Sequence, residues 1–137
     1  MVNGMRNLCG VVLGAVAFFA FVGPAFAHHS FSAEFTDQDP IELTGVLTKV
    51  DWINPHVYLY LDVKDKNGKV TTWSLEGYPT HWFAQAGLKK SMLGEGQTVT
   101  ISAFRAKDGT KQLGFLRKIT YADGHFYQLF TDDAVLH

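Results

Sequence analysis

Apolar and polar residues alternate between residues 56 and 63, which predicts a β-strand with one buried and one outward face. The inward residues are Val57, Leu59, Leu61 and Val63, and the outward residues are His56, Tyr58, Tyr60 and Asp62. Residues 70–76 alternate in the same way, which predicts a hairpin with a loop over 66–68 and Gly68 in a left-handed conformation. This register places Tyr58 opposite Glu76, Tyr60 opposite Ser74, and Asp62 opposite Thr72.

A second apolar pattern covers residues 41–52 and changes phase at Gly45. Ile41 and Leu43 precede this glycine, and the apolar residues after it are Val46, Val50 and Trp52. Because a strand can bend at a glycine, we expect one long, curved strand that serves two sheets. The preceding residues 28–40 are polar apart from Phe31 and Phe35, and we expect them to form an arm without regular structure that lies on the domain.

The rest of the chain predicts a short helix and further strands. The helix is expected over 81–86, and strands are expected over 97–105, 113–121 and, at a sheet edge, within 125–130. Three strands, a short helix and two strands match a mainly β fold, a small OB-like five-stranded barrel with the helix between strands 3 and 4. Another small β-barrel or sandwich is the alternative. The tryptophans are expected in the core: Trp52, Trp73 and Trp82.

The start of the chain has the pattern of an export sequence. Arg6 precedes an apolar run over 8–22, and Ala25-Phe26-Ala27 fits a cleavage site. The expected division is a signal peptide 1–27, an arm 28–40, a barrel domain 41–130 and a polar tail 131–137. The apolar run is shorter than the roughly 20 residues that span a bilayer, so we expect a periplasmic or secreted protein without a stable membrane anchor after cleavage. An uncleaved membrane anchor is the less favoured alternative.

Composition limits the size, the reactive groups and the charge of the expected mature chain. Cleavage after Ala27 would leave 110 of the 137 residues, enough for one domain. The single cysteine, Cys9, lies in the export segment, so thiol chemistry is excluded from the mature protein. Without Arg6 the chain has 11 basic against 13 acidic residues, a balance that predicts no electrostatic attraction to nucleic acid.

Several motifs are distributed along the expected mature chain. They are Ala27-His28-His29-Ser30-Phe31, Trp52-Ile53-Asn54-Pro55-His56, Trp73-Ser74-Leu75-Glu76-Gly77 and Arg105-Ala106-Lys107-Asp108-Gly109. Together they resemble bacterial exported proteins of domain-of-unknown-function family 6152 (DUF6152). The resemblance implies export and a shared small β domain, and it brings no activity. Residues 80–88 depart from the family, which has a more basic sequence there, so no function of those basic residues carries over.

Histidine supplies the main candidate chemistry, because neutral imidazole is a common ligand of transition metals. After cleavage the amine and imidazole of His28 would form one chelate, and His29 or His56 would add a nitrogen, a donor set suited to Cu(II). This set resembles the histidine brace of copper proteins. Two alternatives stay open: a solvated terminus at His28 and His29, and a His56 that only bonds a backbone carbonyl. His81, His125 and His137 are expected at the surface or in packing.

The outward hairpin face offers a second candidate site, for a small ligand, at Tyr58, Tyr60, Asp62 and Glu76. Alternatively the arm covers it: burial of Phe31 and Phe35 against Tyr58 and Tyr60 would bring the terminal histidines toward Glu76 or His56. The favoured function is an exported β-barrel binding protein that holds copper, another divalent metal or a small ligand. The alternatives are an envelope structural or protein-interaction module without metal and, less favoured, a histidine-brace copper oxidative enzyme. Neither the natural ligand nor a protein partner follows from the sequence.

Overall fold

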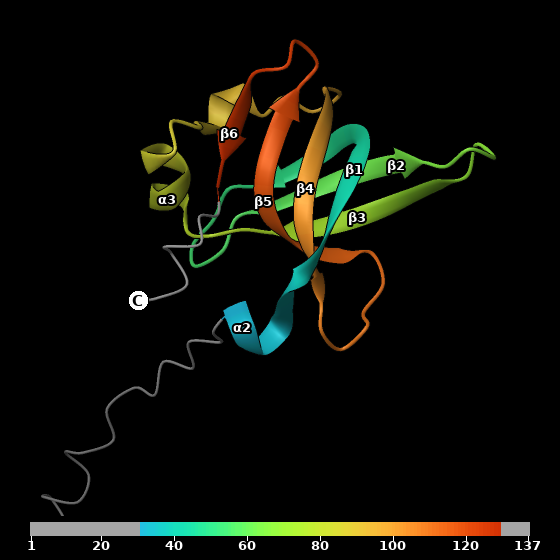
Figure 1. The fold of residues 1–137 in the computed structure, drawn as a ribbon. Helices are drawn as coiled ribbons and strands as arrows, with labels where there is room; N and C mark the ends of the chain where they lie inside the picture. The colour runs from blue at the N-terminus through green and yellow to red at the C-terminus, as the bar shows by residue number, and fades with distance from the viewer. Residues whose placement is uncertain (1–30, 130–137) are drawn as a thin grey trace, which may run out of the picture.

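Five strands close into a small barrel, and a sixth short strand extends it at one edge (Figure 1). The computed structural model describes residues 31–129. The strands are β1 (Phe35–Asp51), β2 (Tyr58–Lys64), β3 (Val70–Glu76), β4 (Thr98–Ala106), β5 (Leu113–Tyr121) and β6 (Phe126–Gln128). The helical elements are α2 (Phe31–Glu34), α3 (Thr80–Gln85) and the 3-10 turn η1 (Lys90–Met92).

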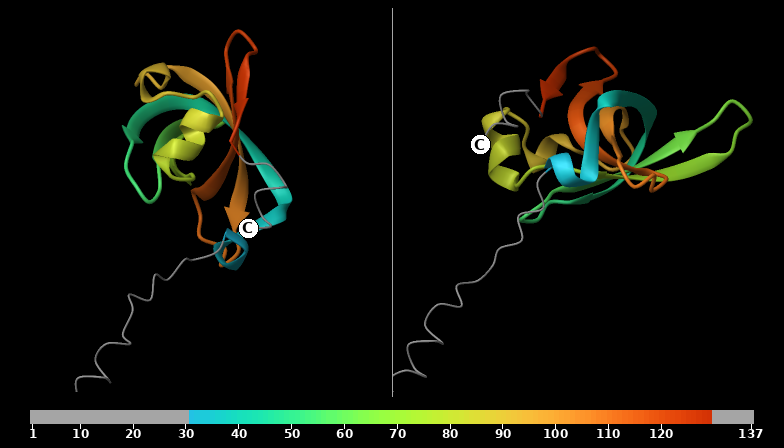
Figure 2. Two further views of the ribbon diagram at one scale, coloured as in Figure 1. Left: turned by 90° about the vertical axis from the view of Figure 1, so that its left-hand side faces the viewer. Right: turned by 60° about the horizontal axis from the view of Figure 1, so that its bottom comes forward.

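The order of the strands confirms the OB-like barrel. Neighbouring strands run β3, β2, β1, β4, β5 and β6, and a parallel pairing of β3 with β5 closes the first five into a barrel. Helix α3 lies between β3 and β4 in the sequence, as predicted, and covers one open end of the barrel (Figure 2). Its Phe83 is buried in the main core. Within residues 31–129 there is no helix with the length and apolarity needed to cross a bilayer.

Strand β1 bends and pairs with two neighbours, which confirms the curved strand. Its Phe35–Val46 part pairs with β4, and its Val46–Asp51 part pairs with β2. At the change of partner, a Cβ on Gly45 would lie 2.9 Å from the carbonyl carbon of Asp62 and closer still to its oxygen. Real Cβ atoms do not approach backbone so closely, so only glycine fits at this position.

One inward residue of β1 was predicted wrongly. Val46 is 40% exposed, whereas Leu47 is completely buried. The ladder with β2 shifts register between Leu47 and Lys49. A bulge adds one residue to a strand and so reverses which residues face inward beyond it. Val50 and Trp52 therefore pack against the core as expected, although Val46 does not.

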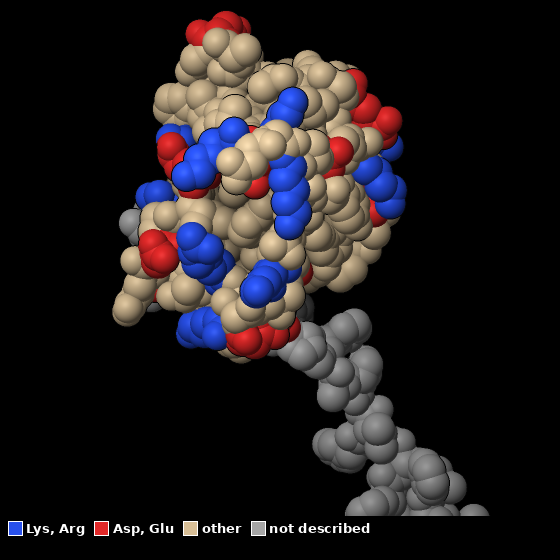
Figure 3. Space-filling view, turned by 90° about the vertical axis from the view of Figure 1, so that its right-hand side faces the viewer, with Lys and Arg blue, Asp and Glu red and all other residues tan. Residues whose placement is uncertain are grey.

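The β2–β3 hairpin has the predicted register. Its pairs include Tyr58 with Glu76, Tyr60 with Ser74, and Asp62 with Thr72. Gly68 has a φ of 83°, as a three-residue bulged loop requires. The far end of the hairpin projects beyond the barrel (Figure 1), and its lysines are Lys64, Lys66 and Lys69. Figure 3 views the molecule from the side toward which the hairpin points.

The prediction that the arm lacks regular structure is wrong for its described part. Residues 31–34 form α2, and β1 already begins at Phe35, which pairs with Ala106. Phe35 is only 3% exposed and forms a second apolar cluster with Phe104 and Phe115. The ring of Phe31 lies 5.2 Å from each of the latter two rings. Burial of these two arm phenylalanines explains why the polar stretch between residues 36 and 40 is ordered as strand.

The tryptophans differ in burial. Trp52 and Trp73 are partly buried and pack against the main core. Trp82 does not lie in the core: it is 37% exposed and stacks on the ring of Tyr78, with centroids 4.9 Å apart. The helix is only six residues long, and its Phe83 occupies the position that faces the barrel. Trp82 therefore lies beside the core, on the outer side of α3.

We expect the substitution Gly45→Ala to destabilise the domain, because the added methyl group must displace the backbone of β2. The cost should be about 3 kcal/mol, typical of overpacking against a backbone that cannot move freely. Urea unfolding monitored by circular dichroism measures it. The control is Glu42→Ala at an exposed position of the same strand, which should change stability by less than about 0.5 kcal/mol. Equal stability of the two variants would contradict this account of β1.

Candidate functional site

His56 lies at the start of the hairpin, where the loop from β1 enters β2. Asn54 Oδ1 in this loop accepts hydrogen bonds from the backbone N–H and the hydroxyl of Thr80, each 3.1 Å long. The backbone ladder continues past the strand ends, since Gly77 N–H donates to the carbonyl of Val57 over 2.8 Å. The backbone on both sides of His56 is therefore fixed by α3 and by the end of β3.

The imidazole of His56 is oriented by two acceptors. Its Nδ1 lies 3.1 Å from the carbonyl oxygen of Gly77 and 2.9 Å from Oε1 of Glu76. Both oxygens accept, so the neutral ring carries its proton on Nδ1 and its lone pair on Nε2. Within residues 31–129, Nε2 has no hydrogen-bond partner. Histidines that bind metals are typically held in this way, with the other nitrogen donating to a carboxylate or a backbone carbonyl.

Tyr58 is the third member of this cluster, because it lies opposite Glu76 in the ladder. Its partial burial, followed by the negative charge of Glu76, raises the pKa of Tyr58 to about 12. The phenol therefore stays protonated at neutral pH and donates to the Glu76 carboxylate. The charge of Glu34 in α2 also contributes to raising this pKa. We call His56, Tyr58 and Glu76 the histidine cluster.

The remaining residues of the predicted ligand face have partners within the domain. Lys49 Nζ lies 4.9 Å from the centre of the Tyr60 ring and 2.8 Å from Asp51. The hydroxyl of Thr72 donates to Asp62 over 2.6 Å. The outward face of the hairpin is thus a ladder of internal polar pairs, and within residues 31–129 the His56 ring adds an imidazole nitrogen, Nε2, without a hydrogen-bond partner.

The predicted ligands His28 and His29 lie outside the described residues. The chain that comes after them is fixed near the histidine cluster, because Phe31 contacts Phe115 and Phe115 is paired with Glu76 across the β3–β5 closure. The alternative in which the arm phenylalanines pack on Tyr58 and Tyr60 is not what the structure has. The apolar cluster that receives these phenylalanines is built on β4 and β5 and does not include the two tyrosines.

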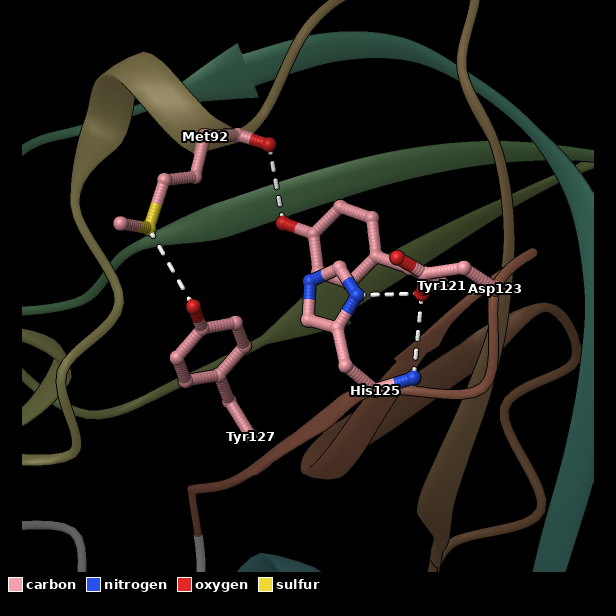
Figure 4. A network of polar contacts seen from close by, with 5 residues as sticks. All are labelled: Met92, Tyr121, Asp123, His125 and Tyr127. Atoms are coloured by element: carbon pink, nitrogen blue, oxygen red, sulfur yellow. Dashed lines mark hydrogen bonds and ion pairs between the residues drawn. The ribbon is translucent and has the colours of Figure 1, made fainter.

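A second histidine–carboxylate pair has a structural role in the turn between β5 and β6 (Figure 4). Asp123 accepts from both the backbone N–H and Nδ1 of His125, and these hydrogen bonds lower the pKa of Asp123. The His125 ring stacks on Tyr121 at 4.4 Å, while the Tyr121 hydroxyl donates to the carbonyl of Met92 over 2.8 Å. Tyr127 adds a contact to the Met92 sulfur at 3.6 Å. The network ties β5 and β6 to η1.

This network agrees with the expectation that His125 is a surface or packing residue, and exposed His81 on α3 agrees too. His137 lies outside the described residues. The pairing of Asp123 with His125 was not predicted, although Asp123-Gly124-His125 is a typical turn sequence. In the part of the chain that the structure describes, no three His, Cys, Asp or Glu side chains are grouped so that they could hold a metal ion.

Fold and site together define a small OB-like barrel with a histidine cluster at the mouth of its first hairpin. The sequence profile of DUF6152, a family of unknown function, matches residues 16–115, and the chain belongs to this family. The resemblance drawn from the motifs is therefore confirmed. No curated protein and no solved structure shows significant similarity to the chain.

The hydrogen bonds to His56 predict its tautomer. In the neutral ring, long-range ¹H–¹⁵N spectra should show the proton on Nδ1. Glu76→Ala should move part of the population to the Nε2–H form, because one of two acceptors is lost. Thr72→Ala, at an outward position of the same strand, should leave the His56 signals unchanged. A His56 ring that is protonated on Nε2 in the unaltered protein would contradict this geometry.

Proposed function

We propose that the protein is exported and binds copper, or another divalent metal, between its mature N-terminus and the barrel. The ligands are the amine and imidazole of His28, with further nitrogens from His29 and from Nε2 of His56. The observation that carries the proposal is the state of the His56 ring, whose Nδ1–H is committed to Gly77 and Glu76 while Nε2 remains available. Nitrogen ligands of this kind suit Cu(II).

The path of the arm supports the proposal. Phe31 is packed on Phe104 and Phe115, and Lys107 donates from its backbone to the carbonyl of Glu34 over 2.8 Å. His28 is three residues before Phe31, a stretch that spans at most about 10 Å. Attachment through Phe31 would raise the local concentration of the terminal amine at the histidine cluster.

The export part of the proposal is supported by the sequence pattern that ends at Ala27. Cleavage there is what creates the free amine of His28, so export and the chelate are linked. An interaction module without metal is the second candidate. The exposed ring of Trp82, which stacks on partly buried Tyr78, favours it, because an exposed aromatic ring offers a contact surface. Catalysis remains the less favoured alternative.

Copper titration tests the proposal. Protein that begins at His28 should bind one Cu(II), detected by calorimetry and electron paramagnetic resonance. One alanine added before His28 should weaken binding on the order of 100-fold, because the chelating amine is lost, and His56→Gln should weaken it about tenfold. The control is His81→Gln, which should have no effect.

The outcomes separate the parts of the proposal. A loss with the added alanine but none with His56→Gln would exclude His56 as a ligand. Binding that is equal in all variants, or negligible in all, would overturn the amino-terminal site and leave the interaction module.

Anchoring of the arm gives a further test. Phe31→Ala removes the ring that packs on Phe104 and Phe115, so the terminus should sample more positions and Cu(II) affinity should fall about tenfold. The barrel core keeps its residues, so the Trp and Tyr spectra of the apo protein should be unchanged. Unaltered affinity in this variant would show that the site is assembled without the arm.

A further inference from the structure

A cleft of about 220 Å³ lies between β3 and the loop that joins β4 to β5. It is lined by Trp73 of β3, by Arg105 and Ala106 at the end of β4, by residues 109–112 of the loop, and by Leu113 at the start of β5. The histidine cluster has no residue in this lining. The cleft is therefore a separate feature, and a ligand bound in it would be independent of the proposed metal site.

The wall of the cleft is held in place by hydrogen bonds at several points. The backbone of Lys107 donates to the Glu34 carbonyl over 2.8 Å, and Thr110 N–H donates to the Asp108 carboxylate over 2.8 Å. Gln112 has a positive φ of 56°, which is uncommon for a residue other than glycine, and its carbonyl accepts from Ser74 N–H over 2.9 Å. The loop is thus fixed to both the arm and β3.

The cleft has a cationic rim. Arg105 and Lys111 both line it, and the one acidic partner of Arg105 within residues 31–129 is Asp39, at 3.3 Å and largely exposed. In the same part of the chain, Lys111 forms no ion pair, and the backbone N–H groups of Lys111 and Gln112 donate to no acceptor. Figure 3 views the molecule from this side, on which Lys and Arg side chains are interspersed with Asp and Glu side chains. An anionic group fits such a set of donors.

The lining of the cleft includes an aromatic residue. Trp73 pairs with Leu61, packs against the main core and also lines the cleft. An indole face gives a flat apolar surface for the apolar face of a sugar ring. Trp73 is the one aromatic residue of the lining, whereas surfaces for single-stranded nucleic acid stack successive bases on several aromatic rings. The volume is small for a ligand pocket, which suits a single ring.

We infer that this cleft binds an acidic sugar of the uronic-acid type, with its carboxylate at Arg105 and Lys111 and its ring on Trp73. The carboxylate is recognised by charge-assisted hydrogen bonds, and the ring by burial of its apolar face.

The probe is a trimer of galacturonic acid, titrated into the full mature protein in the presence of a metal chelator and followed by calorimetry and by amide and indole NMR signals. We expect saturable binding that shifts the Trp73 indole and the Lys111 amide. Lys111→Gln should weaken binding about tenfold, the value of one charge-assisted hydrogen bond. Trp73→Phe should weaken it severalfold, and thermal unfolding checks that this variant is folded. The control is Lys89→Gln at an exposed lysine outside the cleft.

Each of the following results would overturn the inference that the cleft binds an acidic sugar. Equal binding of a neutral galactose trimer would remove the role of charge. Binding of inorganic sulfate as tight as that of the uronide, insensitive to Trp73→Phe, would reduce the cleft to an anion site. Tighter binding of a short oligothymidine would indicate nucleic acid, and absence of binding to all probes would show no site. The chelator keeps these outcomes separate from the copper titration, so either proposal can fail alone.

Discussion

The close approach of β1 to β2 at Gly45 is the constraint on which the rest of the structure depends. A single strand supplies ladders to both β2 and β4, and it can do so only where the backbones nearly touch at the change of partner. The hairpin then lies at an angle that brings β3 beside β5. The parallel pairing from Ser74 with Leu113 to Glu76 with Phe115 closes the barrel and removes two open sheet edges.

Closure of the barrel also determines what lies beside the histidine cluster. Glu76 pairs with Phe115, and Phe115 belongs to the aromatic cluster that receives Phe31 and Phe35. The arm is therefore attached where β3 meets β5, next to the carboxylate that orients His56. Barrel closure, arm packing and the orientation of the imidazole share the same few residues. A change at any of them should affect the other two, as expected for residues in contact.

The sequence predicted the strands and their pairing well because these depend on local patterns. Alternation and the Lys66-Asn67-Gly68 loop were sufficient for the hairpin register, and hence for the pairing of Tyr58 with Glu76. The bulge after Leu47 and the strand from Phe35 to Pro40 were missed, because each is determined by contacts with distant residues. The cleft beside Trp73 was missed for the same reason: β3 and the β4–β5 loop are distant in sequence and meet only when the barrel closes.

His56 shows how two interpretations of one side chain can apply to different atoms of its ring. A bond to a backbone carbonyl and a role as metal ligand were alternatives when the residue was considered as a whole. In the structure they concern different atoms, since Nδ1 contacts Gly77 and Glu76 while the lone pair is left on Nε2. The structural bond does not compete with ligation. It fixes the tautomer and the ring orientation that ligation requires, so a His56 that serves the fold is also better prepared to bind a metal.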